Sequence, residues 1–288
     1  MEIMMHFVHV DTTTSSAPTV THVIPGEAPV TAVTSLGDDV FVVRYDKSQQ
    51  VLVYDAVTFT LQRHLSVPGL GRSFGLAACA SNKCLYASDF DNDRVHRVEL
   101  SGSNAVTSWS VGRRPVGLTV NSAKNVLVVI RDERQLRQFT THGTPSQTIQ
   151  LQPDIEYPRR VVELSNGQFV INHTGAHHRV CLLDDKGAVV RSYGGTPGSD
   201  LTTMNCPRGL AVDENENILV ADNDNNRLLV LDRSLTSARE MSVSVDGGLK
   251  SPRSLCYDKS RGRLYIGELS GRRVIIIDHL KDFTASQV

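Results

Sequence analysis

The chain has 288 residues, of which 40% are hydrophobic and 6% aromatic, and 30 basic and 31 acidic residues leave a net charge of −1. A nearly neutral chain has no overall attraction for nucleic acid or membranes, so any electrostatic function must come from an uneven distribution of charge. No run approaches the ~18 apolar residues of a membrane span, and the start, MEIMMHFVHVD, lacks the features of a secretory signal, so we expect a cytoplasmic protein without a membrane partner.

The N-terminal segment precedes the patterned part of the chain. Residues 1–20 show little hydrophobic periodicity and are predicted to form a tail. Thr21–Pro25 (THVIP) is a short β-branched segment, typical of a strand, with no pairing partner near it in the sequence. Residues 21–288 are predicted to form a single domain.

Short apolar runs recur about every 45 residues along this domain. The pattern is clearest in Pro207–Asp232, where Leu210–Val212, Ile218–Ala221 and Leu228–Leu231 each have the length of a strand, and Ala238–Val243 is a fourth candidate. Polar and Asp/Asn-rich turns separate the runs. Each repeat therefore predicts a four-stranded antiparallel meander. The repeats begin near Pro29, Ser73, Pro115, Pro158, Pro207 and Pro252.

Six such units predict an all-β fold, a closed six-bladed β-propeller of four-stranded antiparallel blades. The last repeat supplies three clear strands, at Leu255–Tyr257, Leu264–Gly267 and Val274–Asp278, whereas Asp282–Val288 is only a weak fourth. We therefore expect Thr21–Pro25 to complete the last blade. Closing the ring with strands from both ends of the chain removes an exposed edge that would favour aggregation.

The run PRGLAVDENENILVADNDNNRLLVLD resembles an NHL repeat, and FGLAACASNKCLYASDFDNDRVHRV and RSLCYDKSRGRLYIGELSGRRVIIID are similar to it. A WD40 propeller would need a Trp-Asp pair in each blade, but Trp109 is the single tryptophan; kelch repeats are disfavoured because paired glycines occur only twice. NHL propellers of the tripartite-motif and related regulators, relatives from the ubiquitin pathway, bind protein partners or single-stranded RNA. Their ligase activity is not expected here, since the sequence shows no RING, B-box or coiled-coil segment.

Acidic and basic residues bracket the turn between the second and third strands in three of the blades. Such a pair is expected to clamp the turn, which is a structural role. The predicted turn pairs are Asp89/Arg94, Asp222/Arg227 and Glu268/Arg273.

Charge is sorted between the two faces of the predicted ring. The connections between blades and the turns between second and third strands emerge on one face, which we call the basic face because arginines dominate its between-blade connections. Arginine can bind two oxygens of a carboxylate or phosphate at once, and Tyr157 could stack a base. The alternative is a solvated rim whose arginines pair with nearby acids. The predicted ligand-binding residues are Arg113, Arg114, Arg131, Arg134, Tyr157, Arg159, Arg160, Arg179, His177 and Arg208.

These patterns favour a monomeric, non-enzymatic binding module that presents its basic face to a protein or peptide partner, in particular an acidic one. Single-stranded RNA on the same face is the first alternative, and a metal-dependent lyase or lactonase-like propeller enzyme is the second. A metal-dependent propeller enzyme would need metal ligands that converge on the central channel from several blades, whereas His173, His177 and His178 all come from one turn. No catalytic residue, metal or cofactor is therefore expected. Cys79 and Cys84 flank one turn and could pair, although a reducing compartment disfavours a disulfide.

Overall fold

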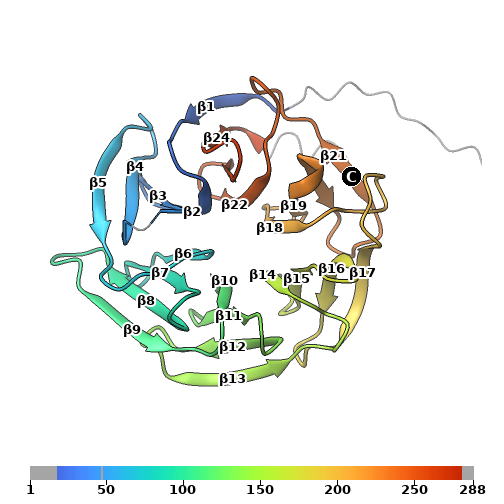
Figure 1. Ribbon diagram of the computed structural model, residues 1–288, viewed down its shortest axis with the longest axis horizontal. Coiled ribbons are helices and arrows are strands. Elements are labelled where there is room, and N and C mark those ends of the chain that lie inside the picture. The colour runs from blue at the N-terminus through green and yellow to red at the C-terminus, as the bar shows by residue number, and fades with distance from the viewer. Residues whose placement is uncertain (1–17, 47, 281–288) are drawn as a thin grey trace, which may run out of the picture.

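The computed structural model describes residues 18–46 and 48–280. Its strands form six four-stranded antiparallel sheets, and Figure 1 shows them arranged as blades around one central axis. The predicted all-β six-bladed propeller is thereby confirmed. Among the described residues, helical structure is limited to the short 3-10 helix η1, Asn223–Asn225, and to Leu280.

The blades follow one another along the chain, each running from an inner strand at the axis to an outer strand. Blade one comprises β2 Val30–Leu36, β3 Asp39–Arg44, β4 Gln50–Asp55 and β5 Leu61–Ser66. Blade two comprises β6 Leu76–Cys79, β7 Cys84–Asp89, β8 Arg94–Glu99 and β9 Val106–Ser110. Blade three comprises β10 Pro115–Val120, β11 Val126–Ile130, β12 Gln135–Phe139 and β13 Pro145–Gln150.

The second half of the ring has the same construction. Blade four comprises β14 Pro158–Glu163, β15 Phe169–His173, β16 His178–Leu183 and β17 Val189–Gly195. Blade five comprises β18 Pro207–Val212, β19 Ile218–Asp222, β20 Arg227–Leu231 and β21 Ala238–Met241. Blade six comprises β22 Pro252–Asp258, β23 Arg263–Glu268, β24 Val274–Ile277 and, as its outer strand, β1 Val20–Ile24.

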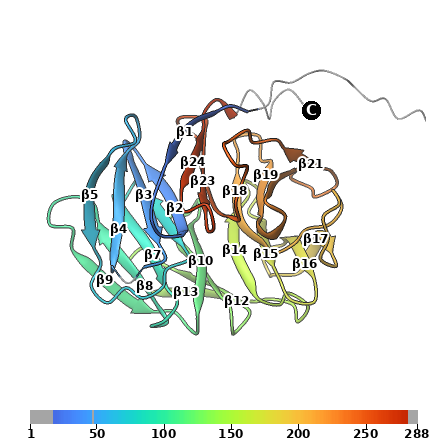
Figure 2. The same ribbon diagram turned by 45° about the horizontal axis from the view of Figure 1, so that its top comes forward.

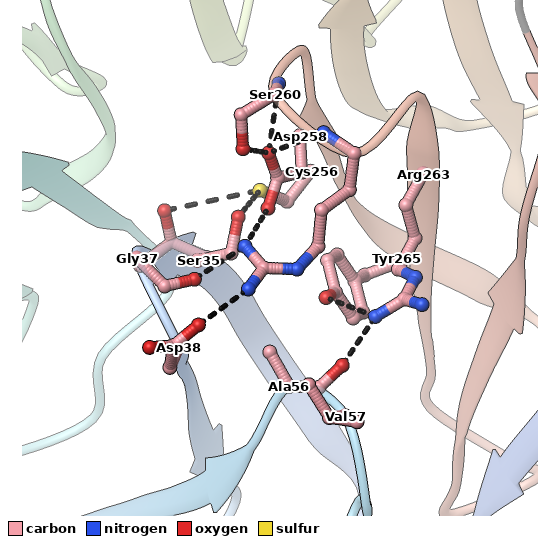
Figure 3. Close-up of polar contacts among 12 residues, drawn as sticks. Ser35, Gly37, Asp38, Ala56, Val57, Cys256, Asp258, Ser260, Arg263 and Tyr265 are labelled. Atoms are coloured by element: carbon pink, nitrogen blue, oxygen red, sulfur yellow. Dashed lines mark hydrogen bonds and ion pairs between the residues drawn. The ribbon is translucent and has the colours of Figure 1, made fainter.

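The N-terminal strand closes the ring, as the sequence predicts. β1 pairs antiparallel with β24, with Ile24 opposite Val274, and Figure 2 shows the two strands side by side. Side chains of blade six also reach blade one: Arg261 donates to the Gly37 carbonyl at 2.5 Å, and Arg263 donates to the Ala56 carbonyl, drawn in Figure 3. Residues 1–17 of the predicted tail and the weak strand at 282–288 lie outside the described residues.

The hydrophobic core consists of six clusters, one between each pair of neighbouring blades. Most members are Val, Leu and Ile, because a strand buried on both faces favours β-branched and aliphatic side chains. Close packing at the axis explains the glycines of the repeat. A Cβ on Gly117 would lie 2.3 Å from the Arg159 carbonyl oxygen, so only glycine allows β10 and β14 to approach this closely.

A β-bulge recurs at the second residue of the inner strands. In β14, Pro158 pairs with His173 and Arg160 with Asn172, which leaves Arg159 unpaired. Arg208 is skipped in the same way in β18, and Arg253 in β22. Because a bulge redirects a side chain, this position aims its residue toward the axis.

The strand pairing also corrects the alignment of the first repeat. Val30 pairs with Arg44 as Pro207 pairs with Asp222, so Val30, rather than Pro29, occupies the position of the repeat proline.

All five cysteines are free, so Cys79 and Cys84 form no disulfide although they lie opposite each other across β6 and β7. No helix in the described part of the chain is long and apolar enough to cross a membrane.

Candidate anion site at the mouth of the central channel

The bulge residues of five blades and Phe74, which precedes the inner strand of blade two, meet around one cavity at the start of the inner strands, on the basic face. This cavity, the channel mouth, has a volume of about 20 Å³, which is room for a water molecule or the end of a ligand. Blades four, five and six each contribute an arginine, and we call these three the arginine triad. The channel mouth is lined by Thr31, Phe74, Val116, Arg159, Arg208 and Arg253, with Arg160 deeper in the channel.

The arginine triad has no acidic partner. None of the ion pairs among the described residues includes Arg159, Arg208 or Arg253. Arg159 donates to the Thr174 hydroxyl at 3.3 Å, and the guanidinium carbon of Arg253 lies 4.9 Å from the centre of the Phe74 ring. The Nε atoms of Arg159 and Arg208 are buried and donate to no acceptor in the described chain. Buried donors without acceptors are costly, and a ligand could satisfy them.

The electrostatics of the channel mouth agree with this geometry. Burial, joined by repulsion from Arg208, Arg159 and Arg160, lowers the pKa of Arg253 to about 9. Burial and the charge of Arg208 lower the pKa of Arg159 to about 10. Both guanidiniums stay charged at pH 7, so the channel mouth concentrates positive charge that no carboxylate neutralises. Perturbed pKa values of this kind cluster at ligand sites.

Five of the predicted site residues lie elsewhere on the basic face, around a cavity of about 530 Å³ that we call the rim pocket. Two acids, Asp132 and Glu156, share it. Asp132 pairs with Arg131 at 3.1 Å and with Arg114 at 3.3 Å, so part of the predicted basic density is neutralised. The rim pocket is lined by Arg113, Arg114, Arg131, Asp132, Arg134, Glu156 and Tyr157.

The remaining predicted residues are dispersed. Arg159 and Arg208 belong to the arginine triad, and Arg160 is buried inside the channel. Arg179 pairs with Asp154 at 2.6 Å, and His177 is exposed in the turn before β16. The structure therefore divides one predicted site into the channel mouth, the rim pocket and isolated surface residues.

Arg253 was not among the predicted site residues although it completes the arginine triad. The sequence does carry a signal for it: a Pro-Arg dipeptide opens three consecutive repeats, at Pro158, Pro207 and Pro252. The density of arginines along the sequence favours blades three and four as the site. Comparing equivalent positions of the repeats instead places Arg253 beside Arg208.

The predicted turn pairs differ between blades. Asp222 and Arg227 form a buried ion pair at 2.8 Å, and Glu268 and Arg273 form one at 2.7 Å. The pair Asp89/Arg94 is wrong: Asp89 bonds to His96 at 3.0 Å, while Arg94 donates to the Ser108 hydroxyl. His96 is buried beside the carboxylate, whereas Arg94 is exposed.

His173 predicts a pH dependence of stability. Burial, together with the charge of Arg179, lowers its pKa to about 4, from an ordinary value of 6.5. The unfolded chain therefore binds a proton that the folded protein excludes, so the stability contributed by the neutral imidazole is complete above pH 6.5 and lost as the pH falls toward 4. We expect a loss of roughly 1–2 kcal/mol across this window. Urea denaturation at a series of pH values should show a flatter profile for His173→Gln and an unchanged one for His177→Gln.

Comparisons with known proteins agree with the fold. A family model of the NHL repeat matches residues 204–231. A streptogramin B lyase structure is 11% identical over 89% of this chain and 96% of its own, with a TM-score of 0.63. Virginiamycin B lyase from Staphylococcus aureus is 10% identical over 86% of this chain and 81% of its own, with a TM-score of 0.64. A Bacteroides thetaiotaomicron protein of unknown function is 14% identical over 92% of this chain and 70% of its own, with a TM-score of 0.69. No curated protein matches the sequence.

These matches overturn the assignment to a non-enzymatic binding module for a protein or peptide. That assignment rested on the fold and on a freely charged face, but the same fold occurs in proteins named as lyases, and the acids of the rim pocket neutralise part of the face. The alternative of single-stranded RNA on the basic face loses the support of a freely charged face in the same way. For the metal-dependent alternative, the described residues contain no group of three His, Cys, Asp or Glu side chains that could hold a metal ion. At these identities the likeness shows the fold alone: the chain is a six-bladed β-propeller that carries an NHL repeat in its fifth blade.

Proposed function

We propose that this propeller recognises a small anionic ligand, a carboxylate or phosphate compound, at the mouth of its central channel. The observation that carries the proposal is the convergence of Arg159, Arg208 and Arg253 on one cavity without an acidic partner. Three planar guanidiniums can supply several charge-assisted hydrogen bonds to oxyanions. A structural role alone would favour pairing these charges, as the chain does in its buried turn pairs.

The size of the channel mouth limits the part of the ligand that enters. A volume of about 20 Å³ admits an oxyanion end and leaves the rest of the molecule above the basic face. The Phe74 ring forms part of the wall and offers apolar contact beside the charges. The triad is suited to recognition rather than to proton transfer, since its shifted pKa values of about 9 and 10 lie well above 7.

The test is isothermal titration calorimetry with citrate, with inorganic phosphate and with uncharged glycerol, at low and at high ionic strength. We expect saturable binding of an anion but not of glycerol, weakened by salt and weakened about 10-fold by Arg208→Gln. Arg191→Gln, which removes an exposed arginine of β17, is the control and should bind as wild type. Absence of saturable anion binding, or equal weakening in both variants, would refute the proposal. The relation to tripartite-motif regulators, the cytoplasmic location and the monomeric state stay predictions.

A further inference from the structure

Arg160 adds a fourth positive charge to the channel mouth. It lines the same cavity as the arginine triad and also the cavity of about 200 Å³ that follows along the channel, so it lies below the triad. Its Nη2 donates to the Ser254 hydroxyl at 3.2 Å, and none of the ion pairs among the described residues includes it. Burial lowers its pKa to about 10, so Arg160 remains charged at pH 7. An uncompensated buried charge is strongly unfavourable, which makes an external anion the expected partner.

These four positive charges lie close enough to affect one another. Burial, and then repulsion from the other three arginines, lowers the pKa of Arg253. Burial and the charge of Arg208 do the same for Arg159. The residues that line the channel mouth include no carboxylate that could offset this repulsion. A ligand with one negative charge would leave most of the positive charge uncompensated, so the cavity favours a ligand that brings about two.

The size of the channel mouth places these negative charges on a single group. A volume of about 20 Å³ has no room for several separate carboxylates of one ligand. A carboxylate carries one charge on two oxygens, whereas a phosphate monoester carries about −1.5 to −2 charges at pH 7 on three terminal oxygens. Arginines from blades four, five and six can donate to all three of these oxygens, because each guanidinium offers several N–H groups.

We propose that the channel mouth binds the phosphate group of a small phosphate monoester, with the arginine triad around its terminal oxygens and Arg160 beneath them. This inference rests on the proposed recognition of an anion at the channel mouth, and it narrows the ligand from carboxylates and phosphates to a dianionic phosphate. The triad occupies one half of the ring. The other half is uncharged, since blades one, two and three contribute Thr31, Phe74 and Val116. The organic part of the ester can therefore lie over that half, beside the Phe74 ring.

The first test compares three anions that carry the same aromatic ring. Phenyl phosphate, phenyl sulfate and benzoate are titrated into the unaltered protein by calorimetry at pH 7.5 and at pH 5. Phenyl sulfate has the tetrahedral shape and the three terminal oxygens of phenyl phosphate but one negative charge fewer. At pH 7.5 we expect phenyl phosphate to bind about 10-fold or more tighter than either other anion. At pH 5, below the second pKa of the phosphate at about 6, its advantage over phenyl sulfate should fall about fivefold or more.

The second test removes the fourth charge. Arg160→Met should weaken phenyl phosphate about 10-fold and phenyl sulfate less, whereas Arg191→Gln should bind both as wild type does. Urea denaturation verifies that each variant folds, and the three anions on wild type decide the proposal if Arg160→Met does not fold.

The outcomes separate this inference from the proposed function. If benzoate or phenyl sulfate binds as tightly as phenyl phosphate, or if the advantage of phenyl phosphate is the same at both pH values, the dianionic phosphate alone is refuted. Phenyl phosphate binding unchanged in Arg160→Met would refute the place of Arg160 beneath the phosphate. Binding of none of the three anions would refute anion recognition at the channel mouth as well.

Discussion

The double variant Arg208→Gln/Arg253→Met is expected to lose about 100-fold or more in affinity for the anion that binds the channel mouth. The same variant is expected to be more stable than wild type when no ligand is present. The loss follows because two of the three guanidiniums that face the cavity are removed. The gain follows because Arg253 is destabilised by burial and by its neighbours Arg208, Arg159 and Arg160, as its lowered pKa indicates. We expect roughly 1–2 kcal/mol of added stability, discounted for partial exposure.

Opposite changes in affinity and stability distinguish a ligand site from a structural cluster. Methionine keeps an apolar contact with the Phe74 ring, over which Arg253 lies at 4.9 Å, so the substitution removes charge with little loss of packing. Chemical denaturation without ligand gives the stability, and calorimetry gives the affinity. Arg191→Gln serves again as the surface control. A double variant that is less stable than wild type would show that the triad holds the blades together, and would contradict the proposed role.

The fold was predictable because the repeat is periodic. Each inner strand begins at an equivalent position, so Pro158, Pro207 and Pro252 align without a structure. The N-terminal strand was predictable by elimination, since the last repeat lacks a clear outer strand and Val20–Ile24 has no other partner. These inferences rely on backbone pairing, which short apolar runs at a regular spacing indicate directly.

The site was less predictable because it depends on where side chains point and what they meet. Counting arginines over blades three and four could not show that Asp132 contacts two of them. It also could not show that a bulge directs Arg159, Arg208 and Arg253 to the axis, since a bulge is a change of pairing rather than of composition. Asp89 illustrates the same limit: Arg94 is the residue directly opposite it, yet the buried His96 is the partner.

The turn of blade five is clamped by the ion pair between Asp222 and Arg227. Arg227→Met is expected to destabilise the protein by about 3–5 kcal/mol, because it leaves Asp222 buried without its counter-charge. Asp222 is fully buried and accepts from Arg227 Nε at 2.8 Å. The same guanidinium donates to the carbonyls of Ser199 at 2.6 Å and of Asp200 and Thr203 at 2.9 Å, which would also lose a donor. It thus anchors the long connection between blades four and five to the blade that follows.

A matched surface pair separates burial from charge. Arg63 and Asp39 lie 2.7 Å apart, almost the same distance as Arg227 and Asp222, but their side chains are 42% and 29% exposed against 9% and 0%. Arg63→Met should therefore change the unfolding free energy by less than about 1 kcal/mol. Urea denaturation of both variants tests the difference, and limited proteolysis should cut Arg227→Met faster within residues 196–206 if the anchor is lost. Equal, small effects in the two variants would mean that the buried pair contributes no more than a surface contact and that other contacts of blade five hold the connection.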